Sequence, residues 1–391
     1  MSSQQADHPE PRTAGQEPAG PKGRDHEPGE WDQETFARIV STDLSPDQVE
    51  RLVTPSEVFH RQAAVMAVHW HPEWIPLELA RRRLETAFPN RQRELVIPTQ
   101  HNELMTMGGL AGVEVDCYSA GFNRKVQLLL HLREGRLARA DVLRSMLLHT
   151  SQYRSGQLWE FLDSLVAPPR DQRRQEAAAE TGANEEVVEF ATLHARKLKA
   201  LLEQHEQRLP RIMIKNKLVS EFIAAQRAHN PDRLINRALL YVQAVKQLVK
   251  RDFSLQYFYR TSEVIEEARS LGAGVVIPHP EQFWPILLAD YDVDGYEVWN
   301  PQSRQFTEFL INVLCRQNKS RRPKERRLLV FMGDDTHLGE KTKDPALQDR
   351  AKGSREVGLQ PAWDDPPIRK ALMLAGMERD RVLEEYEGRL T

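Results

Sequence analysis

Short apolar runs separated by amphipathic segments occupy the first and last thirds of the chain. The runs, between residues 61 and 337, read RQAAVMAVHWH, RELVIPTQH, LAGVEVDCYS, KVQLLLHL, VVIPHP and LLVFMGDDTH. Each contains an apolar stretch of strand length that ends at proline or polar residues. Segments such as PLELARRRLETAF, with Leu77, Leu84 and Phe88 at helical spacing, lie between them. Strands that alternate with helices predict an α/β fold, with the sheet closing into a barrel.

The pattern changes in the middle of the chain. GQLWEFLDSLV, NEEVVEFATLHARKLKALLEQHEQRL and RALLYVQAVKQLV are charged and amphipathic, with almost no strand pattern, and they predict a helical insertion. The chain is therefore divided into a disordered tail, a first barrel part, the insertion, a second barrel part, and a polar loop with a C-terminal helix. These segments are 1–32, 33–135, 136–255, 256–340 and 341–391.

Composition narrows the class of protein. The 391 residues are 40% hydrophobic and 28% charged with a net charge of −3, which does not indicate a dedicated nucleic-acid or membrane-surface binder. Two cysteines, Cys117 and Cys315, imply no disulfide framework. No apolar run is long enough for a membrane helix, and the amino terminus has no signal-peptide core. We expect a cytoplasmic protein whose Pro- and Gly-rich amino terminus is disordered.

Several of the predicted strands end in side chains that bind metals. His69 and His71, like Asp335 and His337, are spaced two apart, so each pair faces the same side of a strand. His101, Glu114 and His279 stand at the ends of other apolar runs. In a parallel barrel the carboxyl ends of the strands meet at one mouth. Imidazole and carboxylate are ligands for zinc, manganese and iron, and a glutamate among histidines can bridge two ions.

The order and spacing of these motifs resemble the PHP (polymerase and histidinol phosphatase) metallohydrolase family. The matching segments are HWH, TQHNE, GVEVD, VVIPHP, GYEVWN and GDDTH, within about residues 62–132 and 256–338. The resemblance implies a distorted (βα)7 TIM-like barrel of PHP type, interrupted here by the helical insertion. It also implies two or three divalent ions and phosphoester hydrolysis.

Two segments depart from the family pattern. Where the family often has a Ser-Asp-Gly-like loop after the first histidine pair, this chain has HPEWIP, so Glu73 is either a replacement ligand or a group that supports one. The place of a further metal histidine falls on Gln127 in KVQLLLHL, with His131 four residues later. Glutamine is a poor zinc ligand, so the sequence favours a two-metal centre over three ions.

The expected chemistry is hydrolysis of a phosphate ester by a metal-activated hydroxide. His69, His71, Glu114, His279 and Asp335 are expected to hold the hydroxide-bearing centre, with Glu114, His279 and Asp335 as the catalytic residues. His101 and His337 are expected to complete a neighbouring ion site. Arg124 and Lys125 are candidate substrate-binding residues. The expected substrate is a small phosphomonoester or a nucleotide.

Alternatives remain open at this point. The protein can be a degenerate PHP barrel with a binding or regulatory role, since the Ser-Asp-Gly-like loop is missing and Gln127 replaces a histidine. It can also be a metal-dependent amidohydrolase, a class that begins with the same His-x-His motif. The Asp-x-His pair of GDDTH argues against the amidohydrolase. Nucleic-acid binding through the basic run KSRRPKERR is an alternative that is not favoured, and the sequence indicates no oligomeric state.

Overall fold

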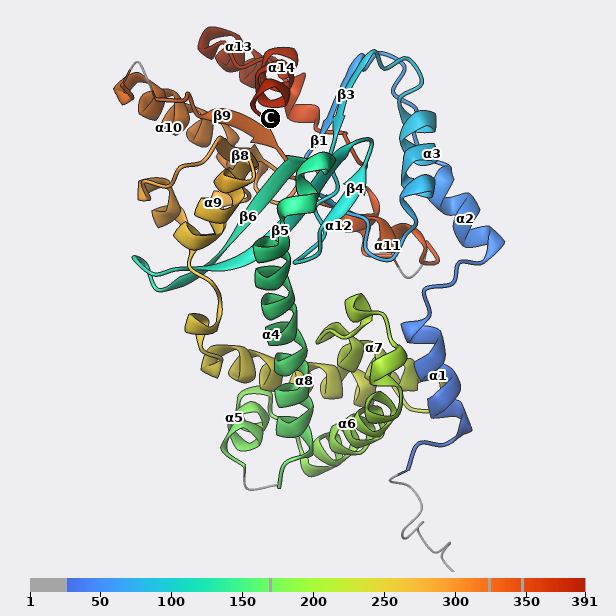
Figure 1. Ribbon diagram of the computed structural model, residues 1–391. Helices are drawn as coiled ribbons and strands as arrows, with labels where there is room; N and C mark the ends of the chain where they lie inside the picture. The colour runs from blue at the N-terminus through green and yellow to red at the C-terminus, as the bar shows by residue number, and fades with distance from the viewer. Residues whose placement is uncertain (1–26, 169–170, 323–324, 346–347, 391) are drawn as a thin grey trace, which may run out of the picture.

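The computed structural model describes residues 27–168, 171–322, 325–345 and 348–390, and it is a mixed α/β structure (Figure 1). The α/β prediction is therefore confirmed. Most of the predicted disordered tail lies outside the described residues. Helix α1 (Glu30–Val40) begins inside the segment assigned to the tail, so ordered structure starts before residue 33. None of the helices in the described part is long and apolar enough to cross a membrane.

The predicted strands are present, with three additions. Met105–Met107 forms a short strand that the sequence pattern did not predict, and the first and last apolar runs each divide into two strands. The strands are β1 (Ala64–Ala67), β2 (Trp70–His71), β3 (Arg93–Val96), β4 (Met105–Met107), β5 (Leu110–Ser119), β6 (Arg124–Arg133), β7 (Gly274–Ile277), β8 (Gly295–Trp299), β9 (Leu329–Met332) and β10 (Thr336–His337).

The largest sheet has the order β4-β5-β6-β7-β8-β9, and two further pairs are β1-β3 and β2-β10. Strand β6 runs antiparallel to both of its neighbours, whereas β7, β8 and β9 are parallel. The parallel barrel expected from the sequence is thus wrong for β4 and β6, which both run antiparallel to β5, because short turns join them directly to it. Closure into a (βα)7 barrel stays a prediction, since the described strands fall into three sheets.

Hydrogen bonds bring the three sheets together at one place. The amide of Asp335 donates to the carbonyl of His69 over 2.9 Å, which ties the end of β9 to the first strands. On the other side, the amide of Asn102 donates to the carbonyl of Glu114 over 2.7 Å, and His101 forms an isolated bridge with Glu114. The polar residues that follow β1, β3 and β9 therefore converge on the middle of β5, at Glu114.

Helices cover the sheet on its outer side (Figure 1). Helix α9 contacts β5 and β7, α10 contacts β8 and β9, and α14 contacts β1 and β9. The final helix expected from the sequence is two helices, because Gly376 takes the left-handed conformation (φ 62°) that ends the first of them. The helices outside the central region are α2 (Pro46–Val53), α3 (Leu77–Ala87), α9 (Thr261–Ser270), α10 (Thr307–Ser320), α11 (Leu338–Lys341), α12 (Arg350–Gly353), α13 (Pro366–Ala375) and α14 (Arg379–Arg389).

The central region is helical and has an apolar core of its own, around Phe161, Leu198, Phe222 and Tyr241. Its helices are α4 (Asp141–Val166), α5 (Gln172–Thr181), α6 (Glu185–His205), α7 (Lys217–Ala225) and α8 (Asp232–Asp252). Helix α4 runs from the sheet into this helical body (Figure 1). Helix α1, assigned to the first barrel part, instead packs against α6 and α7 and adds Phe36 to the helical core.

A buried carboxylate joins the sheet to the helical region. Asp116 on β5 lies 2.8 Å from Lys125 Nζ on β6 and 2.7 Å from Arg154 Nη2 on α4, and it accepts a hydrogen bond from Asn102 Nδ2. Burial alone would raise the pKa of Asp116, but Arg154 and Lys125 lower it below the usual range. The ionised carboxylate therefore holds α4 against β5 and β6.

We expect the substitution Asp116→Asn to lower the free energy of unfolding at neutral pH by about 2 kcal/mol, since both cations stay in place without their partner. A carboxyl whose pKa is depressed on folding stabilises above its unfolded value and loses that contribution as the pH falls. The difference between the two proteins should shrink below about pH 4. Denaturant titrations at neutral and acidic pH measure it. Asp141→Asn, at an exposed pair with Arg144, is the matched control and should change little.

Candidate metal centre

The structure brings all seven predicted ligands together, where the ends of β2, β7 and β10 and the loop after β3 meet the middle of β5. Glu114 lies within β5, so the expectation that it stands at the end of its apolar run is wrong. Their ring nitrogens and carboxylate oxygens form three overlapping groups, and within each group the atoms lie no more than 4.8 Å apart. The groups are His69, His71 and Asp335; His69, Glu114 and His279; and His71, His101 and His337. Within the described part of the chain, no other residue enters such a group.

The spacings around Asp335 are those of atoms that share an ion. Its Oδ1 lies 3.4 Å from His71 Nε2 and 3.5 Å from His337 Nε2. These distances are long for hydrogen bonds. Two ligand atoms on a tetrahedral zinc ion with ordinary bond lengths lie about 3.4 Å apart. The Asp335 carboxylate is thus placed between two histidines at ligand spacing.

Glu114, like Asp335, lies among histidine nitrogens, and both carboxylates face His71 Nε2. Its two oxygens lie 3.6 Å from His71 Nε2 and 3.6 Å from His279 Nε2, and Oε2 also lies directly against His101 Nδ1. The carboxylate, which is 1% exposed, therefore faces three imidazoles. It has the position required to bridge two ions.

Buried polar atoms without hydrogen-bond partners test whether these residues fit a metal. Glu114 Oε2 and His101 Nδ1 are buried and lie against each other without the alignment of a hydrogen bond, and each oxygen of Glu114 also lies 3.6 Å from another histidine nitrogen. Buried polar groups in folded proteins nearly always form well-aligned hydrogen bonds, and a buried carboxylate without one is costly. A divalent cation between the groups would supply the missing charge, so the donor set fits such an ion.

The backbone is strained at the same place. Glu73, Asn102, His279 and Asp335 have positive φ angles of 57°, 54°, 31° and 47°. Among the described non-glycine residues, only Asn123 also has a positive φ. This conformation is costly for residues other than glycine, and it persists where surrounding structure imposes it, often at functional sites. The strain directs side chains from separate loops into one cluster.

The protonation of the first two histidines differs. Burial would lower the pKa of His69, but Glu297, with Asp335 and Glu114, raises it to about 10. Burial and the neighbouring His101 lower the pKa of His71 to about 3, so this imidazole is neutral and its nitrogen is free to bind a cation.

Arg355 orients Asp335. Its Nη1 donates to Asp335 Oδ2 and to the Asp335 backbone carbonyl, both over 2.6 Å. Burial alone would raise the pKa of Asp335, but His337, His71 and His69 lower it far below its usual range. One oxygen is thereby held by Arg355 while the other faces the histidines. The role of Arg355 was not predicted, because it lies in a polar loop with no motif of its own.

Glu297 on β8 was part of the GYEVWN motif but was not among the predicted site residues. Its Oε2 lies 2.5 Å from His69 Nδ1, and both side chains are 1% exposed. A carboxylate that holds one ring nitrogen of a histidine fixes its tautomer and leaves the other nitrogen to bind a metal. Glu297 therefore orients His69 towards Asp335.

The substitution Glu297→Gln should weaken metal binding by about tenfold to a hundredfold, because His69 loses the partner that fixes its ring. Titration of the metal-free protein with zinc or manganese measures the effect. Glu94→Gln, which changes a carboxylate paired with Arg81 and Arg91 on the surface, is the control and should bind as the wild type does. Unchanged affinity in Glu297→Gln would show that His69 is not held for a metal.

Glu73 stands beside the third group of ligands. Its Oε1 lies 3.6 Å from His337 Nδ1 and 3.8 Å from Lys215 Nζ. Burial opposes ionisation, yet His337 and Lys215 lower the pKa of Glu73 to about 2. Because the Glu73 carboxylate is ionised and lies near His101 and His337, Glu73 can either bind a metal itself or support a residue that does.

The remaining sequence candidates lie elsewhere. His131 is a core residue whose nitrogens contact Tyr386 Oη and the Val68 carbonyl at 2.6 and 2.9 Å. Gln127 pairs in register with Asp116 on β5. Arg124 and Lys125 are exposed at the start of β6, where Lys125 binds Asp116, and they are not among the described residues that line the cavity beside the cluster.

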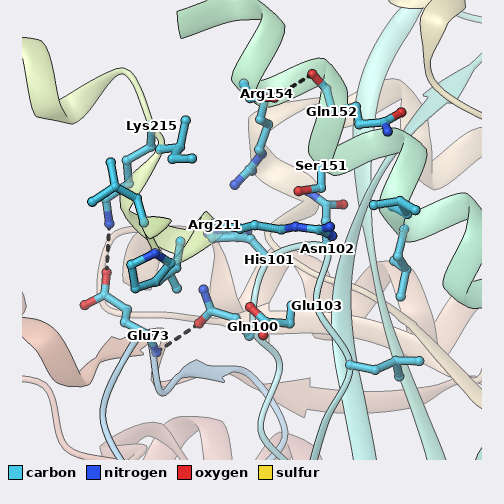
Figure 2. Close-up of a pocket in the computed structure, with 18 of the residues that line it drawn as sticks. Glu73, Gln100, His101, Asn102, Glu103, Ser151, Gln152, Arg154, Arg211 and Lys215 are labelled. Carbon is cyan, nitrogen blue, oxygen red and sulfur yellow. Dashed lines mark hydrogen bonds and ion pairs between the residues drawn. The ribbon is translucent and has the colours of Figure 1, made fainter. Parts of the chain in front are cut away.

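A cavity of about 860 Å³ adjoins the cluster (Figure 2). Its floor includes Glu73 and His101, and its opposite wall comes from α4 and from residues 206–215 of the helical region. A cavity of this size accommodates a small organic molecule. The helical region therefore forms one wall of the space beside His101.

Comparisons with known proteins give distant likenesses only. Neither a family model nor a curated protein matches the sequence. Among solved structures, a Bifidobacterium adolescentis protein assigned as a metal-dependent phosphoesterase is 16% identical, with 82% of this chain and 96% of that chain covered and a TM-score of 0.38. An amidohydrolase from Chromobacterium violaceum, with bound sulfate and no metal, is 14% identical over 79% and 97% of the two chains, also with a TM-score of 0.38. Likenesses at this level carry no argument about function.

Proposed function

We propose that the protein is a metal-dependent hydrolase that cleaves a phosphate ester, in a barrel of PHP type that carries a helical insertion. The observation that supports this proposal is the convergence of three overlapping ligand groups that share His69 and His71. On this proposal His69, His71, Glu114, His279 and Asp335 hold one centre. His101 and His337, with Glu73 beside them, hold its neighbour. Zinc, manganese and iron are the ions that this donor set favours.

When bound, two such ions make hydroxide available at neutral pH and clamp a transferring phosphoryl group. The protein's own residues prepare the site for them. Glu297 holds His69 and Arg355 holds Asp335, so both ligands are oriented before substrate arrives. The helical region forms one wall of the cavity beside His101.

The charge of the cavity favours a phosphate ester over a neutral amide. Arg154, Arg211 and Lys215 line the wall opposite His101, and Arg144 lies further along α4. Guanidinium and ammonium groups bind phosphate oxygens through charge-assisted hydrogen bonds. Three glutamates also line the cavity, so its basic residues exceed its acidic residues by one. Arg154 and Lys215 are partly neutralised by Asp116 and Glu73.

Metal content and hydrolysis test the proposal together. Purified protein should contain two or more equivalents of zinc, manganese or iron by mass spectrometry, and His69→Ala and Asp335→Ala should contain less. Metal-loaded protein should hydrolyse members of a panel of phosphomonoesters and nucleotides. Cleavage of amides without phosphate esters would identify an amidohydrolase instead. Failure to retain added metal and to turn over any substrate would point to a degenerate barrel with a binding role.

A further inference from the structure

The strand that leads to the first pair of ligands is open along one edge. Among the described strands β1 pairs only with β3, and His69 follows the end of β1 by two residues. On the β3 side, the carbonyls of Ala67 and Trp70 accept hydrogen bonds from backbone amides that follow β3. The carbonyls of the other edge need donors from elsewhere, because buried backbone groups are seldom left unpaired.

Side chains supply these donors at three alternate carbonyls of the open edge. The pairs, with the distance from donor nitrogen to carbonyl oxygen, are Arg379 Nη1 with Ala64 (3.3 Å), Gln360 Nε2 with Met66 (2.7 Å) and His131 Nε2 with Val68 (2.9 Å). Successive carbonyls of a strand point to opposite edges, so acceptors two residues apart share one edge. Side chains therefore take the place of a neighbouring strand beside β1.

The contact with Val68 fixes the tautomer of His131. A carbonyl oxygen only accepts hydrogen bonds, so His131 Nε2 carries the proton and donates it to Val68. Burial lowers the pKa of His131 to about 3, although the hydrogen bond to Val68 opposes this shift, so the imidazole is neutral. Its Nδ1 then accepts a hydrogen bond from Tyr386 Oη on α14 over 2.6 Å. Both ring nitrogens of this buried histidine are thus paired.

Glycines on the neighbouring strands leave room for these rings. Gly112 on β5 and Gly274 on β7 are the residues that pair in register with His131. A Cβ on Gly274 would lie 2.4 Å from Tyr386 Oη, and a Cβ on Gly112 would lie 3.4 Å from the His131 ring. The tyrosine hydroxyl reaches His131 because Gly274 has no side chain.

These contacts bear on His69 because Val68 precedes it. The Val68 carbonyl belongs to the planar peptide group that joins Val68 to His69, so His131 holds the orientation of that plane. The carbonyl of His69 accepts a hydrogen bond from the amide of Asp335 over 2.9 Å, and Glu297 holds the His69 ring. The peptide groups on both sides of His69 and its ring are therefore held by three different residues.

We propose that His131 is a positioning residue for the metal centre, which sets the direction of His69 Nε2 through the Val68 carbonyl. The inference rests on the metal centre of the proposed function and on no particular substrate. Tyr386 supports His131 from α14, and Gln360 and Arg379 hold the same edge of β1. The C-terminal segment, which lies outside the part of the chain that resembles the PHP family, thereby takes part in forming the site.

Two amide substitutions separate the two hydrogen bonds of His131. The longer side chain in His131→Gln places its amide near the position of Nε2, where it donates to Val68. The shorter side chain in His131→Asn places its amide near the position of Nδ1, where it accepts from Tyr386 and does not reach Val68. Each variant leaves one former partner of His131 unpaired, so a role in stability alone predicts similar effects of the two substitutions.

Metal affinity distinguishes the two variants. We expect His131→Gln to bind zinc within about threefold of wild type and His131→Asn to bind it about tenfold more weakly, the lower end of the range for outer partners of metal ligands. Titration of the metal-free full chain with zinc measures the affinity, and circular dichroism shows whether each variant folds. Equal affinity in the two variants would overturn the proposal.

Arg379→Met is the matched control, because it removes a contact of the same kind at Ala64, further from His69 along β1. It should bind zinc as the wild type does. A loss equal to that of His131→Asn would assign the whole edge to stability alone and overturn the proposal.

Nitrogen NMR of wild-type protein labelled at histidine needs no variant. It should show a neutral His131 with its proton on Nε2, and a proton on Nδ1 instead would overturn the proposal. The two proposals also fail separately. A protein that binds zinc but cleaves no phosphate ester contradicts the proposed function. Equal zinc affinity in His131→Gln and His131→Asn contradicts the positioning role of His131 even where an ester is cleaved.

Discussion

Replacing Glu114 by glutamine is expected to remove bound metal and to lower kcat for phosphate ester hydrolysis by at least about a hundredfold. Even the outer partners of metal ligands usually cost tenfold to a hundredfold when they are removed, and a carboxylate that contacts several ligands should cost more. Glu114 is the one carboxylate in the group that joins His69 and His279. The glutamine keeps the shape of the side chain and removes the negative charge that three imidazoles face.

The measurement is metal content by mass spectrometry beside steady-state kinetics, with circular dichroism to show that the variant folds. Glu281→Gln is the matched control, because Glu281 lies two residues after His279 and its carboxylate accepts a hydrogen bond from Asn300 but enters none of the ligand groups. A Glu114→Gln variant that keeps its full metal content and activity would contradict the assignment of this cluster as a metal centre.

Replacing Gly339 by alanine should disturb the site through packing alone. A Cβ at this position would lie 2.2 Å from Glu73 Oε2 and 2.4 Å from the ring of Trp74, so both side chains must move. Trp74 packs against both the helical core and the small core around Trp70, and Lys215 lies over its ring. We expect a loss of about 1–3 kcal/mol in the free energy of unfolding, the usual cost of overpacking. Displaced Glu73 would also lose its contact with His337.

Denaturant unfolding and metal stoichiometry, measured on the same preparation, test this expectation. Gly156→Ala is the control, since Gly156 lies within α4 and an added Cβ would meet no atom within 4 Å. That variant should be unchanged or more stable by about 0.5–1 kcal/mol, because alanine favours the helix. If Gly339→Ala is as stable as Gly156→Ala and binds metal normally, the close packing of Glu73 and Trp74 does not support the site.

Six of the seven ligands that the sequence revealed lie at or just after the end of an apolar run, whereas Glu114 lies in the middle of β5. Strand ends converge in an α/β fold, and side chains two residues apart on a strand face the same way. His69 meets His71, and Asp335 meets His337, as the spacing predicts. Strand alternation alone does not explain this, because His69 and Asp335 lie just before β2 and β10 and Asp335 has a φ of 47°. The α/β class followed from the same alternation of strands and helices. These predictions rest on local periodicity.

The features that were missed depend on contacts between distant segments. Arg355 binds Asp335 from a loop without hydrophobic periodicity. The residues of α1 alone do not indicate that α1 packs on α6 and α7. The antiparallel direction of β6 was missed because its apolar run reads like that of a parallel strand. Arg211 was not predicted, since the sequence does not distinguish it from the other arginines of the helical region. Only the structure shows that it lines the cavity.

The continuity of α4 restricts how the space above the metal centre can change. Leu143 and Leu147 near its start belong to the sheet core, whereas Phe161 and Leu165 near its end belong to the helical core. An unbroken helix of 26 residues, about 39 Å long, therefore connects the sheet core at its start with the helical core at its end. A hinge at this connection would have to break the helix. A change in the distance between the cluster and the helical region would therefore require α4 to bend or break.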